Sequence, residues 1–147
     1  MKITVAWIGK SKEPAIQALT GEYLKRLSRY AQVEGVAFKD ESSLLALANP
    51  KSQTKARLVV LDSRGKQFSS EELAKFLESH QQSSSQPLLF AVGPADGFSE
   101  EARKAAAATL SFGKMTLSHE LARVVLLEQL YRAFTILKGH PYHLGHR

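Results

Sequence analysis

The feature that most constrains the fold is a series of short apolar runs, each about as long as one strand. In the clearest runs valine, isoleucine, leucine and phenylalanine follow one another, without the alternation of polar and apolar residues expected when one strand face is in water. Strands that are apolar on both faces are typical of a parallel sheet covered by helices. The runs are Lys2–Ile8, the weaker Gln32–Phe38, Ala56–Asp62, Pro87–Val92, and one or two short strands within Leu110–Leu117.

Segments with helical periodicity separate these runs. Apolar residues recur at helical spacing over Glu13–Tyr30, and Pro14 stands near the start of that segment. Ser69 and Glu72 have the spacing of a capping box, and Ser99 precedes an alanine-rich helix. The other predicted helices are the short Ser42–Ala48 and the long Ser118–Lys138.

The alternation of strands and helices predicts an α/β fold with a mostly parallel sheet, in one domain of 147 residues. Ligands of such sheets bind beyond the carboxyl ends of the strands. Three loops are therefore candidates for a binding site: Leu61–Lys66, Gly93–Phe98 and Phe112–Glu120. Within the first loop we expect a turn at Ser63–Lys66, and the polar stretch Ser79–Gln86 is predicted to be a loop as well.

The net charge of +6 is distributed unevenly along the chain. Residues 1–30 carry six Lys and Arg against two acids, residues 31–102 carry seven against ten, and residues 103–147 carry seven against two. A chain that is basic at both ends is a candidate for a phosphate-rich partner, because each neutralised phosphate releases a counterion. Lys25, Arg26 and Arg29 are equally compatible with the solvated face of a helix, so charge alone leaves RNA binding open.

Several classes of site are excluded by composition and motif. The chain has no cysteine, which excludes disulfides, thiolate metal sites and cysteine nucleophiles. Gly93–Gly97 lies where a dinucleotide-binding loop would be, but it lacks the G-x-G-x-x-G spacing, and Pro94 removes a backbone donor. His119 and Glu120 begin a zinc-protease motif that fails because Arg123 occupies the position of the second histidine.

Two further expectations concern metals and membranes. His140, His143 and His146 are spaced by three residues, and a metal site there is the less favoured alternative because the segment contains Pro141 and Gly145. No apolar run approaches the length of a membrane span, and no cleavable leader is recognisable after Lys2. We therefore expect a soluble, cytoplasmic protein that has no membrane partner.

Two long segments identify a family. Phe90–Phe98 (FAVGPADGF) and Leu110–Phe134 (LSFGKMTLSHELARVVLLEQLYRAF) closely resemble the RlmH family of ribosomal RNA methyltransferases. The opening Met1–Lys10 (MKITVAWIGK), Glu22–Leu27 (EYLKRL) and the ending His140–His143 (HPYH) fit the same family. The resemblance therefore covers essentially the whole chain.

The resemblance implies a SPOUT-type α/β fold with a C-terminal trefoil knot and a homodimer. It further implies that S-adenosylmethionine is the methyl donor, that no metal takes part, and that the acceptor is N3 of a pseudouridine in 23S ribosomal RNA of the large subunit or whole ribosome. The chain departs from the family at Pro94, where a second glycine is usual, and in the added residues Leu144–Arg147. The segment Asp40–Lys55 is also short for the family.

The family's cofactor site, carried over by position, has a physical rationale at each place. Leu61 ends a strand and offers apolar packing, and Gly93 lets a ligand approach the backbone. Met115 and Leu117 offer apolar walls, although without the resemblance both would be read as ordinary core residues. The complete set is Leu61, Gly93, Phe112, Gly113, Lys114, Met115, Thr116 and Leu117.

The catalytic candidates follow from the reaction that the resemblance implies. Methyl transfer needs alignment of donor and acceptor, and the acceptor imide must lose its proton. His119, Tyr142 and His143 are candidates for handling that proton, and Arg123 and Arg132 for contacting phosphate or the imide oxygen. His119 is also compatible with a helix-start role, and Tyr142 with simple packing.

The tail and the long helix carry two more expectations. Gly139 and Pro141 end the helix, so we expect the following residues to be mobile and to meet the RNA. The helix Ser118–Lys138 is apolar on more than one face, which favours a second subunit over burial within one chain. Two other functions stay open on the residues alone: a non-enzymatic RNA-binding α/β domain, and a small hydrolase that uses another nucleotide.

Overall fold

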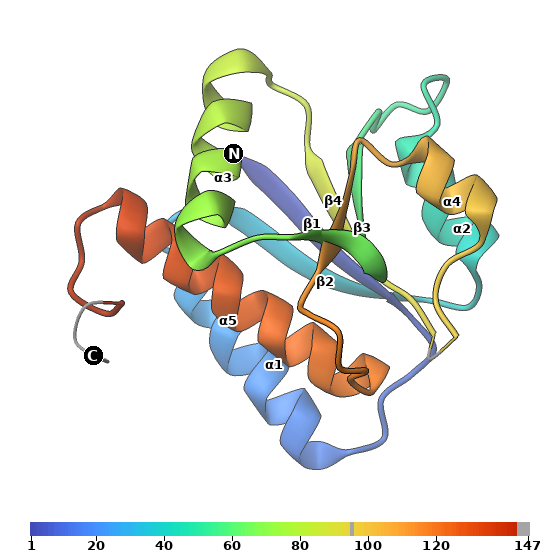
Figure 1. Ribbon diagram of the computed structural model, residues 1–147, viewed down its shortest axis with the longest axis horizontal. Helices are drawn as coiled ribbons and strands as arrows, with labels where there is room; N and C mark the ends of the chain where they lie inside the picture. Colours follow the sequence, from blue (N-terminus) through green and yellow to red (C-terminus); the bar gives the residue numbers. More distant parts are fainter. Residues whose placement is uncertain (95, 144–147) are drawn as a thin grey trace.

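The computed structural model describes residues 1–94 and 96–143 and has a parallel five-stranded sheet between two layers of helices (Figure 1). The strand order is β2-β1-β4-β3-β5, and every neighbouring pair is parallel. The strands are β1 (Lys2–Ile8), β2 (Gln32–Phe38), β3 (Arg57–Gln67), β4 (Leu88–Val92) and β5 (Ala108–Ser111). The helices are α1 (Pro14–Leu27), α2 (Glu41–Leu45) with the 3-10 turn Ala46–Ala48, α3 (Ser70–Ser83), α4 (Glu100–Ala105) and α5 (His119–Leu137).

Both faces of the sheet are buried, as the apolar runs predict. Val5 of β1 belongs to the larger core cluster, which joins the sheet to α1, α3 and α5 and includes Leu126. Ala6, the next residue along β1, belongs to the second cluster with Leu44 of α2 and Ala102 of α4. The predicted α/β class is therefore confirmed. In the described part of the chain no helix is long and apolar enough to cross a membrane.

The turn expected at Ser63–Lys66 is wrong. β3 continues to Gln67, and Leu110 of β5 is the pairing partner of both Leu61 and Lys66. This register shift carries the second part of β3 across β5 before the chain enters α3 (Figure 1). Gly65 permits the crossing, because a Cβ there would lie 2.5 Å from the backbone oxygen of Thr109.

The loop expected at Ser79–Gln86 is also partly helix. α3 runs to Ser83 because His80 is buried and anchors the last turn. Its ring nitrogens lie 3.1 Å from Arg57 Nη1 and 2.7 Å from the backbone oxygen of Gln86. The capping box of Ser69 and Glu72 at the other end of α3 is formed as predicted.

The long C-terminal helix agrees with its prediction to within one residue at each end. The Ser118 side chain caps α5 by accepting a hydrogen bond from the backbone N–H of Leu121. Gly139 ends the helical segment with a φ of +69°, a conformation that favours glycine. α5 packs beside α1 and α3 on one face of the sheet.

Candidate functional site

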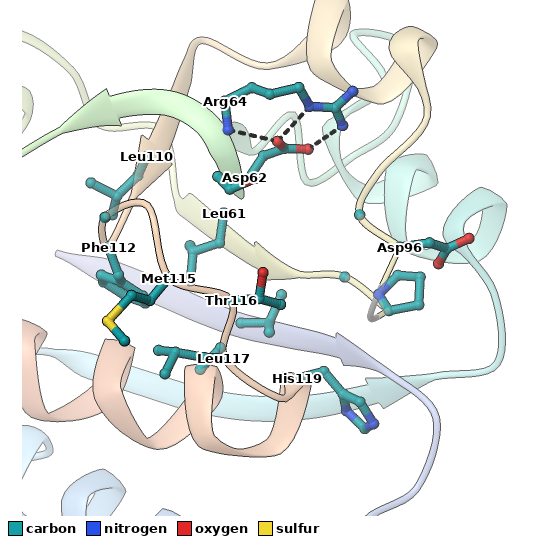
Figure 2. A pocket seen from close by; sticks show the side chains of 17 residues that line it. Leu61, Asp62, Arg64, Asp96, Leu110, Phe112, Met115, Thr116, Leu117 and His119 are labelled. Atoms are coloured by element: carbon teal, nitrogen blue, oxygen red, sulfur yellow. Dashed lines mark hydrogen bonds and ion pairs between the residues drawn. The ribbon is translucent and has the colours of Figure 1, made fainter.

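A pocket of about 240 Å³ opens at the carboxyl ends of β4 and β5 and beside the strand between them, β3, at Leu61–Arg64 (Figure 2). Residues from all three candidate loops line it, so the expectation that these loops meet is confirmed. Seven of the eight predicted cofactor residues are in the lining, and Lys114 is not. The seven are Leu61, Gly93, Phe112, Gly113, Met115, Thr116 and Leu117.

The loop after β5 forms one wall of the pocket. The buried Ser111 hydroxyl holds its first turn, accepting from the N–H of Gly113 at 3.0 Å and lying 3.1 Å from the Gly113 carbonyl. Gly113 has a φ of +127°, which other residues rarely adopt. Met115 is 87% exposed and Leu117 also lies in the open, so the ordinary-core interpretation of these residues is wrong.

Gly93 lines the pocket for a different reason than the sequence indicates. A Cβ at this position would lie 2.8 Å from the ring of Phe98, which is itself buried in the second core cluster. We expected a side chain at Gly93 to occupy the ligand's volume. Instead it would first displace Phe98 and the Gly93–Phe98 loop, so the glycine sets the shape of the pocket wall.

The charged lining of the pocket comprises Asp62, Arg64 and Asp96, none of which was among the predicted site residues (Figure 2). The carboxylate of Asp62 accepts from Arg64 Nε at 2.8 Å, Nη2 at 2.7 Å and the backbone N–H at 3.0 Å. These hydrogen bonds lower the pKa of Asp62 to about 2. The available signal was a charged residue directly after an apolar run, at the edge where ligands bind.

At the start of α5, two predicted catalytic residues have unsatisfied polar atoms. His119 lines the pocket, and its Nδ1 is buried without a hydrogen-bond partner in the described part of the chain. Arg123 is 2% exposed and lies over the ring of Trp7, with 4.0 Å between its guanidinium carbon and the ring centroid. Within the described residues its Nε and Nη2 also have no partner, and burial lowers its pKa. Contact with RNA through Arg123 stays a prediction that requires the side chain to move.

At the other end of α5, Tyr142 and His143 pack onto the helix. The Tyr142 hydroxyl donates to Glu128 at 3.1 Å, and its ring stands edge-on to Tyr131 with centroids 4.8 Å apart. Arg132 Nη2 donates to Glu128 at 2.6 Å, and Arg132 Nη1 lies 3.0 Å from His143 Nδ1. Burial raises the pKa of Tyr142. The tail up to His143 is therefore docked in this structure, where the sequence led us to expect a free segment.

One chain does not bring the predicted catalytic residues together. His119 is the first residue of α5, whereas Tyr142 contacts Glu128 and Tyr131, nine and twelve residues further along and roughly 14–18 Å up the helix axis. No group of three potential metal-ligating side chains occurs within residues 1–94 and 96–143. His146, the third member of the regular histidine spacing, and the added tail residues Leu144–Arg147 lie outside the described residues.

Comparisons with known proteins agree with the resemblance. The family model described as "Predicted SPOUT methyltransferase" matches residues 1–143. A protein of Koribacter versatilis named ribosomal RNA large subunit methyltransferase H is 60% identical over 146 residues, covering 99% of this chain and 100% of the relative. Proteins of the same name from Geotalea daltonii and Gloeobacter violaceus are 40% and 42% identical, covering 97% and 99% of this chain and 99% and 100% of their own lengths.

A solved Legionella pneumophila structure, described as a methyltransferase with bound S-adenosylmethionine, is more distant. It is 13% identical, with a TM-score of 0.48, and the match covers 90% of this chain and 66% of that one. The family assignment rests on the family model and on the full-length relatives. On these matches, the chain belongs to the SPOUT methyltransferases and, within them, to the RlmH family.

Proposed function

We propose that this chain is an S-adenosylmethionine-dependent methyltransferase of large-subunit ribosomal RNA, and that it modifies N3 of a pseudouridine in 23S RNA. The observation that carries the proposal is the pocket at the carboxyl ends of β4 and β5 and beside β3. It lies in a chain that is 60% identical over nearly its full length to a protein named for this RNA. The nucleotide and the atom are the finer part of the proposal.

The pocket residues fit the two halves of this methyl donor. Leu61, Leu110 and Leu117 offer an apolar surface for an adenine ring, and the backbone of Phe112–Leu117 offers hydrogen-bonding groups for its edge. Asp62 places a negative charge in the same cavity, which suits a cationic ligand. When bound, S-adenosylmethionine supplies a methyl group on a positively charged sulfur.

The chain's own residues must orient the acceptor, exclude water and handle one proton. His119 is our first candidate for accepting the imide proton, because it lies in the pocket lining and its buried Nδ1 has no partner among the described residues. Tyr142, His143 and Arg132 are the other candidates, and they lie against the second half of α5, outside the pocket lining. In this proposal, these residues of one subunit act at the pocket of a second subunit.

A homodimer is therefore part of the proposal. Four large apolar side chains are exposed at the mouth of the pocket and on the first turn of α5: Phe112, Met115, Leu117 and Leu121. Exposed apolar side chains that lie together mark an interaction surface more often than scattered ones do. A two-fold axis beside this surface would bring the tail of one protomer toward the pocket of the other.

Two measurements test the function. Isothermal titration calorimetry should show saturable binding of S-adenosylmethionine, and single-turnover reactions should transfer its labelled methyl group to ribosomes or large subunits. Mass spectrometry of the digested 23S RNA should then find the label on N3 of one pseudouridine. Binding of ribosomal RNA without binding of the donor would instead support the non-enzymatic alternative. Label on another base or atom would retain the enzyme and reject the proposed acceptor.

A further inference from the structure

The pocket has two chemically different ends (Figure 2). One end is apolar and is formed by Leu61, Leu110, Phe112 and Leu117. Elsewhere the lining carries Asp96 and the ion pair of Asp62 and Arg64, in which Asp62 ends the predicted strand and Arg64 belongs to the predicted turn that is strand in the structure. A ligand that fills the whole pocket must therefore have an apolar part and a charged part.

The ion pair has unused hydrogen-bonding capacity. A carboxylate has about four acceptor sites, and Arg64 uses three of those on Asp62. The Asp62 side chain is 2% exposed, so a further donor reaches it only from within the pocket. The Arg64 side chain is 54% exposed, and its Nη1 has no hydrogen-bond partner within residues 1–94 and 96–143.

Gly97 keeps access to the pair open. It lines the pocket with a φ of +83°, and a Cβ there would lie 3.2 Å from Asp62 Oδ2 and 3.4 Å from Arg64 Nη2. At Gly97 the chain therefore passes both charged groups without a side chain between them. A side chain at Gly97 would occupy the space directly beside the fourth acceptor site of Asp62.

We propose that Asp62 and Arg64 bind the amino-acid end of the methyl donor, with Asp62 accepting from its ammonium group and Arg64 Nη1 donating to its carboxylate. This inference rests on the proposed function, because it takes S-adenosylmethionine as the ligand. The adenosine then lies against the apolar end and the loop Phe112–Leu117. A zwitterion presents one cation and one anion on the same carbon, and the ion pair presents the complementary charges side by side.

The ion pair of Asp62 and Arg64 has an alternative, structural role, in which it stabilises β3 where that strand crosses β5. The two explanations predict different ligand selectivities. If the role is structural, loss of the ion pair distorts the pocket and lowers the affinity for every adenosine-containing ligand equally. If the role is ligand recognition, loss of the ion pair lowers the affinity only for ligands that carry an amino-acid end.

Calorimetry with two ligands separates these explanations. S-adenosylhomocysteine carries the amino-acid end, and 5′-methylthioadenosine has the same thioether and adenosine without it. In Arg64→Gln we expect the affinity for S-adenosylhomocysteine to fall about tenfold, as for one exposed charge-assisted hydrogen bond, and that for 5′-methylthioadenosine to stay within twofold. Arg64→Lys should recover part of the loss. Lys66→Gln, which removes the same charge two residues away and outside the pocket lining, is the matched control.

The outcomes distinguish this inference from the function on which it rests. If the unaltered protein binds neither S-adenosylmethionine nor S-adenosylhomocysteine, the proposed function is rejected. If it binds both, and Arg64→Gln weakens the two test ligands equally or neither of them, the inference is overturned and the function stands. Asp62→Asn, with its melting temperature checked against the unaltered protein, should show the same selective loss through the ammonium group.

Discussion

The two ends of α5 differ in how far the chain satisfies its own polar groups. At the first turn, His119 and Arg123 have buried nitrogens without partners among the described residues, and Leu121 is 50% exposed. From the middle of the helix onward, Arg132 contacts Glu128 and His143, and Tyr142 donates to Glu128. A buried polar group without a partner is costly unless something outside the chain supplies one.

This difference indicates which part of α5 binds other molecules. The start of α5 has the unsatisfied atoms and the exposed apolar side chains expected where a ligand and a second subunit bind. The end of α5 is complete within one chain, so Tyr142 and His143 must exchange existing contacts before they act on RNA. Binding of the donor should therefore respond to changes at the first turn of α5 and the pocket, and transfer of the methyl group to changes in the tail that packs on the second half of α5.

The largest expected effect is on transfer, when Tyr142 and His143 are both changed to alanine. We expect single-turnover methylation of ribosomes to fall by about a hundredfold or more, because proton handling is lost. Affinity for the donor should stay within about threefold, under 1 kcal/mol, because neither Tyr142 nor His143 lines the pocket. The measurements are labelled-methyl transfer and calorimetry on the same variant.

Glu71→Gln is the matched control for the tail. It removes the ion pair of 3.2 Å between Glu71 and His143 Nε2 and keeps both tail side chains. Transfer should change by less than about twofold, since the Glu71 side chain is 61% exposed and such pairs contribute little. If the double variant keeps its activity, the tail is a structural ending and the chemistry must rest on His119. If affinity and transfer fall together, the tail belongs to the donor site.

Gly93→Val is expected to have the next largest effect, at the pocket itself. The new side chain meets the ring of Phe98, and overpacking of this kind costs about 1–3 kcal/mol of the free energy of unfolding. Because Phe98 and the Gly93–Phe98 loop must move, affinity for S-adenosylhomocysteine should fall at least about tenfold. Gly21→Ala in α1, where a Cβ meets nothing within 4 Å, should leave affinity unchanged and stabilise the fold slightly. Unchanged affinity in a folded Gly93→Val variant would place the donor elsewhere.

Features that depend on neighbouring residues were predicted from the sequence, and features that depend on contacts between distant residues were not. The strand Gln32–Phe38 agrees with the structure, and α5 agrees to within one residue, because apolar runs and caps are local signals. The meeting of Leu61–Lys66, Gly93–Phe98 and Phe112–Glu120 at one pocket was predictable because parallel strands run toward the same edge of a sheet, although the first of these segments is strand and not loop. The extension of β3 to Gln67 was not, since it depends on pairing with β5, some forty residues further along the chain.

The charged wall and the docked tail were missed for related reasons. The candidate segment Leu61–Lys66 contains both Asp62 and Arg64, but the sequence does not show that their side chains pair and face the pocket, because that arrangement depends on the continuation of β3 beyond Asp62. The contact of Tyr142 with Glu128 joins residues on either side of a helix end and leaves no periodic pattern. The reaction itself came from the family resemblance, and the trefoil knot that the resemblance implies stays a prediction.

Changing Leu121 to Glu tests whether the exposed apolar end of α5 faces a second subunit. Sedimentation velocity of the unaltered protein at micromolar concentration should give a dimer. The variant should dissociate at concentrations about tenfold higher or more, because a charge replaces an apolar side chain at the interface. The far-ultraviolet circular dichroism spectrum should stay unchanged, since Leu121 is half exposed and contributes little to the core of the monomer. If the unaltered protein is a well-folded monomer, the proposed dimer is rejected. The tail then has no neighbouring pocket at which to act.

The smallest expected effect is the pH dependence of the ion pair between Asp62 and Arg64. The pKa of Asp62 is about 2 in the folded chain against 3.8 in the ordinary carboxyl, so its stabilising effect is present above pH 3.8 and is lost as pH falls toward 2. The full shift corresponds to about 2 kcal/mol, and exposure of the Arg64 side chain reduces the expected value to about 1 kcal/mol. Urea unfolding of Arg64→Gln and the unaltered protein should show this difference at pH 7 and pH 5 and a smaller one at pH 3. Lys66→Gln should show no such trend, and a difference in Arg64→Gln that is constant or grows toward pH 3 would mean that Arg64 does not set the ionisation of Asp62.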